Sequence, residues 1–373
     1  MLFEPFSLAR LTLKNRIVRS ATYEKRADVD GFVTDAVIEL YEELVKGGTG
    51  LIITGNVLVH TSGRSVPQML CIHNDFYIEK LKQLADTVHR LDGNIVMQLV
   101  HGGRQCFPAL LGGQQPVAPS EVYDPSTNVT PRAMNNEEIW ETIEAFGDAA
   151  RRAQCAGFDG VQIHGAHGYL ISEFLSPHTN RRSDYWGGDE ERRFHFLEEV
   201  YKAMRKEVGK HFPIMIKMNA DDYVEGGLTP EESIRIAQRL EELGIAAIEV
   251  SGGMYESGNK TAQLNIKSTD QEAYFRSAAQ LFKEQVHVPI ILVGGLRSRV
   301  LMEEVLQRGD ADLVSLSRPL IREPDLPNKF KAGKEKADCI SCNGCMRFMK
   351  LDMVKCVQLN KEKKPESSSQ NSE

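Results

Sequence analysis

Residues 213–252 read PIMIKMNADDYVEGGLTPEESIRIAQRLEELGIAAIEVSG, and this stretch indicates the fold. Two short apolar runs, 213–219 and 246–252, flank a longer segment with helical periodicity. The runs carry little alternation between apolar and polar residues, as expected for parallel strands that are buried on both faces. The stretch therefore predicts a strand, a helix and a second strand in succession.

The helix within this stretch carries clear start and stop signals. Thr229 is a natural N-cap, Pro230 occupies the first helical position, and Glu232 completes a capping box with Thr229. Gly244 follows the last periodic residue and is placed to end the helix. The same helical pattern, ending in glycine just before a strand, recurs in residues 78–93 and 137–157.

Short apolar, β-branched runs recur along the whole chain and predict a barrel. The runs are residues 16–21, 50–55, 94–100, 159–165, 213–219, 246–252, 289–295 and 311–317. Eight strand-then-helix units predict an α/β fold, a closed (β/α)₈ TIM barrel. An open doubly wound sheet is the alternative, and it is disfavoured because no Gly-x-Gly-x-x-Gly motif opens a first unit.

Composition limits the classes of function. The chain has 373 residues, 41% of them hydrophobic, which is enough to bury a large core. The net charge of −7 is spread along the chain and argues against nucleic acid as a partner. We find no apolar stretch near the roughly 20 residues of a membrane helix, and no signal-peptide core at the N-terminus. We therefore expect a cytoplasmic protein with no membrane partner.

Polar residues and glycines gather at the C-terminal ends of the predicted strands, where TIM-barrel active sites lie. The set comprises Gln98, His101, His164, His167, Tyr169, Lys217, Asn219, Ser251, Gly294, Gly295, Arg297, Ser317 and Arg318. Each residue alone has an ordinary structural explanation, but their convergence on one mouth indicates a functional site. The glycines lie where barrels commonly hold a phosphate through backbone N–H groups.

The types of side chain in this set favour hydride transfer. Two imidazoles, from His164 and His167, can bind a carbonyl oxygen or another anion, and the phenol of Tyr169 can deliver a proton. No Gly-x-Ser-x-Gly motif suggests a serine nucleophile. The two histidines also lack the glutamate of the His-Glu-x-x-His zinc motif. The combination fits reduction of an unsaturated carbonyl compound.

At these residues the chain resembles the old yellow enzyme family, the FMN-dependent NADH:flavin oxidoreductases. The matching segments, which fall within residues 1–330, are LKNRIVRSA (13–21), QLVHGGR (98–104), AGFDGVQIHGAHGYLISEFLSPHTNRRSDYWGG (156–188), GGL (294–296) and LSRPLIREPDLPNK (316–329). The resemblance implies an enzyme, an NAD(P)H-dependent flavin oxidoreductase. Such an enzyme takes hydride from NAD(P)H onto FMN and reduces the activated C=C bond of an enone, enal or enoyl-type substrate.

The resemblance also implies a flavin site. Ala21 and Thr22 would line the flavin at the end of the first strand, and Asn56 would contact it from the second. Gln98 would bind the pyrimidine edge, and Lys217 would lie near N1 and the C2 carbonyl, where it stabilises the anionic reduced ring. The residues implied to hold the FMN phosphate are Gly294, Gly295, Ser317 and Arg318.

The same resemblance assigns the substrate side of the site. His164 and His167 would bind the oxygen of the activating group. Tyr169 would donate a proton to the carbon next to that group, after hydride has reached the β-carbon. His101 and Arg104 belong to the same motif, and a structural role is an equal alternative for them.

Four of the seven cysteines form a Cys-x₂-Cys-x₂-Cys-x₁₀-Cys motif, made by Cys339, Cys342, Cys345 and Cys356. Four soft thiolates suit zinc or an iron–sulfur cluster. The segment resembles the cluster-binding part of larger relatives, the 2,4-dienoyl-CoA reductases and trimethylamine dehydrogenase, which implies a 4Fe–4S cluster. Zinc or an empty site is the alternative. A cluster here would pass single electrons to a separate redox partner.

We thus expect three parts: an FMN-binding barrel (1–330), a Cys-rich metal or iron–sulfur extension (331–358) and a charged, Ser-rich disordered tail (359–373). Three other functions stay open. They are an amine dehydrogenase or demethylase on the same scaffold, a flavin and iron–sulfur electron-transfer protein, and a flavin-free barrel that binds a phosphorylated metabolite. The sequence does not choose between NADH and NADPH, and a homo-oligomer is also compatible with it.

Overall fold

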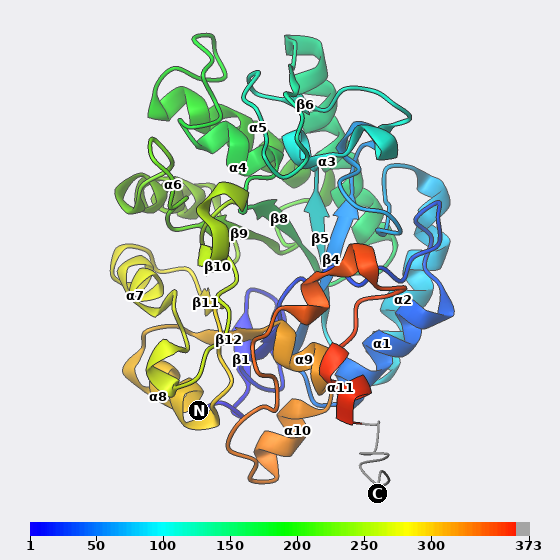
Figure 1. Cartoon of the computed structure of the whole chain (residues 1–373), viewed down its shortest axis with the longest axis vertical. Helices are drawn as coiled ribbons and strands as arrows, with labels where there is room; N and C mark the ends of the chain where they lie inside the picture. Colours follow the sequence, from blue (N-terminus) through cyan, green and yellow to red (C-terminus); the bar gives the residue numbers. More distant parts are fainter. Residues whose placement is uncertain (363–373) are drawn as a thin grey trace, which may run out of the picture.

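The computed structural model describes residues 1–362, and its centre is a closed barrel of eight parallel strands (Figure 1). The barrel strands are β3 (Ile17–Arg19), β4 (Leu51–Leu58), β5 (Ile95–Val100), β8 (Gly160–Gly165), β9 (Ile214–Asn219), β10 (Ile248–Ser251), β11 (Ile290–Leu292) and β12 (Leu313–Leu316). They follow one another around the barrel in sequence order, and β12 pairs with β3 to close it. Each strand overlaps one of the predicted runs, so the predicted TIM barrel is confirmed.

Helices surround the barrel, as Figure 1 shows. They are α1 (Asp35–Lys46), α2 (Ile78–Arg90), α3 (Asn136–Cys155), α4 (Leu170–Leu175), α5 (Glu190–Val208), α6 (Pro230–Leu243), α7 (Arg276–Gln285), α8 (Arg299–Arg308), α9 (Arg318–Arg322) and α10 (Leu326–Lys331). The capping box predicted for α6 is present: the Glu232 N–H donates to Thr229 Oγ1 at 3.3 Å, and the Thr229 N–H donates to Glu232 Oε2 at 3.1 Å. Gly244 ends α6 in the left-handed conformation, with φ of 91°.

Two small sheets lie outside the barrel, and the sequence did not predict them. β1 (Phe6–Leu8) and β2 (Leu11–Leu13) form an antiparallel hairpin, and β6 (Val117–Ala118) pairs with β7 (Arg132–Ala133) in the connection after β5. Leucines of the hairpin pack with apolar side chains from the barrel strands. That apolar cluster fills one end of the barrel interior and leaves the polar side chains at the other end.

The chain after α10, red in Figure 1, packs back against the mouth of the barrel. Lys25 Nζ donates to the Leu351 carbonyl at 2.7 Å, and the Val354 N–H donates to the Glu24 carbonyl at 2.9 Å. Lys25 and Glu24 follow β3, so the Cys-rich extension is tied to the C-terminal end of the first barrel strand. The predicted extension therefore lies beside the predicted site.

The extension itself has little regular structure. It contains two 3₁₀ turns, η7 (Gly344–Met346) and η8 (Phe348–Lys350), and the short helix α11 (Val357–Glu362). Residues 359–362, which we expected to begin a disordered tail, belong to α11. The rest of that predicted tail, 363–373, lies outside the described residues. Within residues 1–362, no helix is both long and apolar enough to cross a membrane.

Candidate active site

A cavity of about 300 Å³ lies at the C-terminal ends of the barrel strands. All the barrel residues that the sequence assigned to flavin or substrate line it: Ala21, Thr22, Asn56, Gln98, His164, His167, Tyr169, Lys217, Gly294, Gly295, Ser317 and Arg318. His101 and Arg104, from the same motif, do not line this cavity. The structure thus brings together residues from distant parts of the sequence and leaves out the two with an alternative structural role.

Beneath the cavity lies a buried polar network that we call the floor network. Its members are Ser20, Gln98, Gln162, Lys217, Glu249 and Ser315. The Glu249 carboxylate, whose exposed fraction is 0%, accepts hydrogen bonds from Ser20 Oγ at 2.7 Å and Ser315 Oγ at 2.9 Å. Lys217 Nζ lies 3.2 Å from the same carboxylate. The floor network therefore contains a buried ion pair.

The Glu249 carboxylate is held in its charged form. Burial alone would raise its pKa, but the positive charge of Lys217 and hydrogen bonds from Ser20, Gln162 and Ser315 together lower that pKa below the usual value. A buried charge is tolerated when it is paired and its lone pairs are satisfied. Both conditions are met here, so the Glu249 carboxylate stays ionised at neutral pH.

Gln98 is connected to the same carboxylate through one intermediate side chain. Gln98 Nε2 donates to Gln162 Oε1 at 2.8 Å, and Gln162 Nε2 donates to Glu249 Oε2 at 3.0 Å. Gln162 and Glu249 are not among the residues predicted from the sequence. A signal was available, because each is a polar residue inside an otherwise apolar run, DGVQIHG and AAIEVSG.

His164, His167 and Tyr169 form a compact group on the wall of the cavity. The ring centroids of the two histidines lie 5.3 Å apart, and those of His164 and Tyr169 lie 4.7 Å apart. His167 Nε2 lies 2.7 Å from Ser251 Oγ at the end of β10. Among the described residues, the buried Nδ1 of His164 has no hydrogen-bond partner. The group therefore presents an unused imidazole nitrogen close to a phenol.

Burial fixes the protonation of this group. It lowers the pKa of His167 to about 3, with a further contribution from Lys217, and it lowers the pKa of His164 well below the usual value. Burial also raises the pKa of Tyr169 to about 12. At neutral pH the imidazoles are therefore uncharged, and the phenol retains its proton.

The opposite side of the cavity has a glycine turn after β11. Gly294 has φ of 125° and Gly295 has φ of 72°, conformations that L-residues rarely adopt. A Cβ atom at Gly295 would lie 2.5 Å from Ile266 Cδ1 and 2.8 Å from Tyr274 Cε1. Only glycine fits this turn, and its backbone closely approaches the cavity.

Arg318 is oriented differently from the simple phosphate contact that we expected. Its Nη1 donates to the Gln263 carbonyl at 2.7 Å and to the side-chain oxygen of Asn343 in the Cys-rich extension. Arg318 lines both the barrel cavity and a smaller cavity under the extension. Its guanidinium therefore links the predicted phosphate side to the extension.

The four cysteines of the extension line that smaller cavity together: Cys339, Cys342, Cys345 and Cys356. Cys345 also lines the barrel cavity, so the two spaces share a wall. In the described part of the chain, no group of three or more His, Cys, Asp or Glu side chains is arranged to hold a single metal ion. The thiols surround one space, and they are not gathered around one point.

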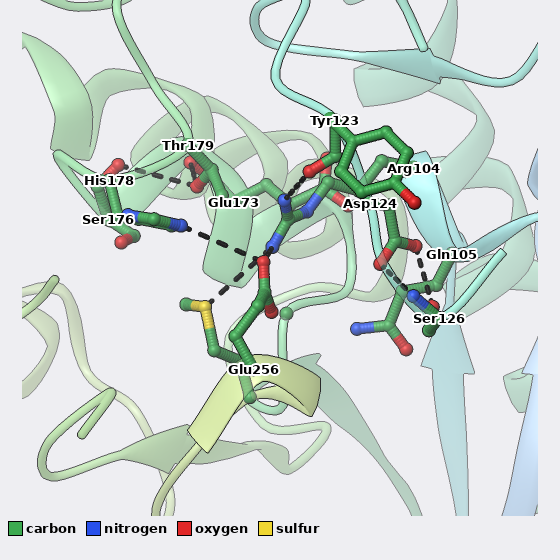
Figure 2. Close-up of polar contacts among 12 residues, drawn as sticks. Arg104, Gln105, Tyr123, Asp124, Ser126, Glu173, Ser176, His178, Thr179 and Glu256 are labelled. Atoms are coloured by element: carbon green, nitrogen blue, oxygen red, sulfur yellow. Dashed lines mark hydrogen bonds and ion pairs between the residues drawn. The ribbon is translucent and has the colours of Figure 1, made fainter. Parts of the chain in front are cut away.

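At the outer edge of the mouth lies a second charged group, the rim network (Figure 2). Its members are Arg104, Tyr123, Glu173, His178, Met254 and Glu256. The buried Arg104 guanidinium donates to the Glu256 carboxylate and, at 3.0 Å, to the Tyr123 carbonyl. Within residues 1–362, the buried Oε2 of Glu173 and Oε2 of Glu256 have no hydrogen-bond partner. The rim network ties the loop after β5 to the loop after β10.

Comparison with known proteins identifies the family of this chain. Residues 1–337 match the model of the NADH:flavin oxidoreductase / NADH oxidase family. The chain belongs to this family. Among solved structures, an old yellow enzyme homologue from Zymomonas mobilis superposes with a TM-score of 0.77 at 30% identity, covering 91% of this chain and 95% of that one. The resemblance seen in the sequence is therefore confirmed.

Curated relatives of the old yellow enzyme family differ in length. An NADH oxidase of Thermoanaerobacter brockii is 40% identical over 92% of this chain but only 53% of its own length. An NADPH dehydrogenase of Geobacillus sp. (strain WCH70) is 37% identical over 92% of this chain and 96% of its own length. The chain thus spans about half of the first relative and nearly all of the second.

Proposed function

We propose that this chain is an NAD(P)H-dependent FMN oxidoreductase that reduces the C=C bond of an unsaturated carbonyl-type substrate. The observation that carries the proposal is the placement of His164, His167 and Tyr169 beside Lys217 in one cavity. Neutral hydrogen-bond donors, a protonated phenol and a buried cation suit a substrate that gains negative charge on oxygen during reaction. A small-molecule substrate fits the size of this cavity.

The cavity fits FMN on its own features. Asn56 Oδ1 is buried and has no hydrogen-bond partner in the described chain, which leaves an acceptor for a ligand. Lys217 and Gln98 would hold the polar edge of the flavin ring, and the turn at Gly294 and Gly295 would approach the phosphate. Bound FMN would supply a site that accepts hydride from NAD(P)H and returns it to substrate.

The remaining flavin contacts follow from the same cavity. Ala21 and Thr22 would line the ring from the end of β3. Thr22 Oγ1 lies 2.9 Å from Ser317 Oγ, so these two hydroxyls join the ring side to the phosphate side. Arg318 would add positive charge near the phosphate while it stays bonded to the extension. NADH and NADPH are both compatible with this cavity.

The side chains on the wall of the cavity would bind the activating oxygen and supply the proton. His164 and His167, as neutral imidazoles, would donate hydrogen bonds to the oxygen of the activating group. Tyr169, with a pKa of about 12, keeps its proton until a carbanion-like carbon forms next to that group. His164 is buried and His167 and Tyr169 are half-buried, which limits the access of water and strengthens each of these interactions.

An amine substrate is disfavoured by the charge of the cavity. Within the described residues, no aspartate or glutamate lines it, whereas Lys217, Arg297 and Arg318 do. A cationic amine would be repelled by these cationic side chains and would find no carboxylate to pair with. The amine dehydrogenase alternative therefore has less support than reduction of a neutral unsaturated carbonyl compound.

We further propose a 4Fe–4S cluster in the extension, held by Cys339, Cys342, Cys345 and Cys356. The four thiols line one cavity without converging on one point. Four soft thiolates around one cavity suit an iron–sulfur cluster, with zinc as the alternative. Electrons could leave through such a cluster to a redox partner.

The proton-donor assignment is tested by Tyr169→Phe in half-reactions. We expect oxidation of the reduced enzyme by 2-cyclohexenone to slow by about a hundredfold, because a general acid typically contributes this much. Reduction by NADPH should stay within about twofold of the wild-type rate. Tyr274→Phe is the matched control, since Tyr274 lines the same cavity with its hydroxyl bonded to the Thr261 carbonyl. Equal slowing of both half-reactions would contradict the assignment.

A further inference from the structure

Glu249 occupies an unusual position relative to the proposed flavin site. It does not line the cavity, and its exposed fraction is 0%. Yet the two side chains proposed to hold the polar edge of the flavin both connect to its carboxylate. Lys217 contacts it directly at 3.2 Å, and Gln98 reaches it through Gln162.

The residues around Glu249 come from strands on different sides of the barrel. Ser20 follows β3, Gln162 is on β8, Lys217 is on β9, and Ser315 is on β12. Ser20 Oγ donates to Glu249 Oε1 and accepts from Lys217 Nζ at 2.8 Å, so the hydroxyl lies between the two charges. Four donors around one carboxylate hold it in a single position.

The Glu249 carboxylate and the Lys217 ammonium group both change the electrostatic potential at the polar edge of the proposed flavin. A buried pair in a region of low dielectric is weakly screened, so each charge is felt by a ligand above it. The ammonium group favours the reduced, negatively charged form of a flavin at that place. The carboxylate beneath it opposes this effect, because it cancels part of the positive potential.

We propose that Glu249 is a positioning residue that lowers the reduction potential of bound FMN by counterbalancing Lys217 and fixing the orientation of Lys217 and Gln98. This inference rests on the proposed FMN site. It adds that the protein sets the reduction potential of the flavin bound there. The pair sets how readily reduced flavin passes its electrons on to the substrate. The floor network is thus part of the redox chemistry as well as of the barrel core.

The test is the midpoint potential of bound FMN in the wild-type enzyme and in Glu249→Gln, measured by equilibration with a reference dye. Glu249→Gln keeps the shape and an acceptor oxygen but removes the negative charge. We expect the two-electron reduction equilibrium to shift toward reduced flavin by at least about tenfold, which is a rise of about 30 mV. An unchanged or lower potential would overturn the proposal.

Two further variants separate charge from structure. Glu249→Asp retains the negative charge, so its potential should lie closer to the wild-type value than that of Glu249→Gln. Glu323→Gln removes another buried glutamate, which pairs with Lys334 away from the cavity, and should leave the potential unchanged. A shift in Glu249→Asp as large as that in Glu249→Gln, or an equal shift in Glu323→Gln, would contradict a specific role of the Glu249 charge.

Stability and cofactor content are controlled separately. If Glu249→Gln does not fold, Lys217→Met/Glu249→Gln is compared with Lys217→Met, both saturated with added FMN, because the double variant leaves neither charge buried alone. The double variant should have the higher potential of the two, and an equal or lower value would overturn the proposal. Wild-type protein without FMN would instead refute the proposed function itself, so the two failures are distinguishable.

Discussion

The mouth of the barrel holds a buried ion pair, Lys217–Glu249, and a partly buried one, Arg104–Glu256, that are built in opposite ways. In the floor network, the Glu249 carboxylate accepts from four side chains on or next to barrel strands. In the rim network, Arg104 pairs with Glu256 across two loops, and carboxylate oxygens of Glu173 and Glu256 lack partners among the described residues (Figure 2). One network is satisfied and rests on the sheet, and the other is incompletely satisfied and joins loops.

This difference indicates which network contributes to the reaction of the flavin. Side chains on strands are held within a small range of positions, as an electrostatic site requires. Loops supply the walls of a site and tolerate adjustment. We therefore assign control of the flavin to the floor network and control of the cavity shape to the rim network.

The largest effect should come from breaking the floor pair. Lys217→Met leaves Glu249 buried without its cation, which should lower the free energy of unfolding by about 3–5 kcal/mol. Turnover should fall by at least about a hundredfold, since a buried donor to the developing charge is lost. Guanidinium chloride unfolding and steady-state kinetics measure both. Turnover near the wild-type rate would contradict the assignment of flavin control to the floor network.

A smaller effect should come from breaking the rim pair. Glu256→Gln weakens one charged hydrogen bond to Arg104 and should lower the free energy of unfolding by about 1–2 kcal/mol. The loop after β10 should loosen, so KM for the substrate should rise several-fold while kcat changes little. Lys334→Gln, at a partly exposed ion pair away from the mouth, is the control. A fall in kcat with KM unchanged would place Glu256 in the chemistry, against our assignment.

The smallest effect is a dependence of stability on pH that comes from two histidines outside both networks. Burial lowers the pKa of both His101 and His167 to about 3, below the usual 6.5. Between these values the unfolded chain binds more protons, so stability is fully present above about pH 6.5 and is lost as the pH falls. Each histidine should account for about 0.7 kcal/mol between pH 7 and pH 6.

Asparagine variants separate the two histidines. His101→Asn and His167→Asn should each flatten the decline of unfolding free energy with falling pH by a similar amount. Only His167→Asn should also weaken substrate binding, because His101 lies outside the cavity and is bonded to Ser62. Weakened substrate binding in both variants would show that His101 also contributes to the site, which would contradict its placement outside the cavity.

The sequence predicted the barrel and the residues lining its cavity because buried parallel strands appear as apolar runs, and the ends of those runs mark the mouth. It missed β1, β2, β6 and β7, which are too short to show a period. It also missed Glu249: the polar residue within the run AAIEVSG was a signal, but its hydrogen-bond partners Ser20 and Ser315 lie far away in sequence. The orientation of Arg318 could not be predicted either, since it depends on where Asn343 of the extension packs.

The spacing of the cysteine motif predicted that the four cysteines lie close together, but it did not determine which metal centre they bind. The four cysteines line one cavity, as their spacing suggested. Replacing Cys356 by serine should remove iron while FMN stays bound, and Cys155→Ser, at an exposed cysteine outside the motif, is the matched control. Equal iron content in both variants would contradict the cluster proposal.

We place the floor network beneath a bound FMN. The most direct test is the visible spectrum of the anaerobically purified protein, with released FMN quantified and iron and acid-labile sulfide measured on the same sample. We predict stoichiometric FMN in the wild-type protein and a marked loss of it in Lys217→Met. A colourless wild-type protein that does not take up added FMN would contradict the account.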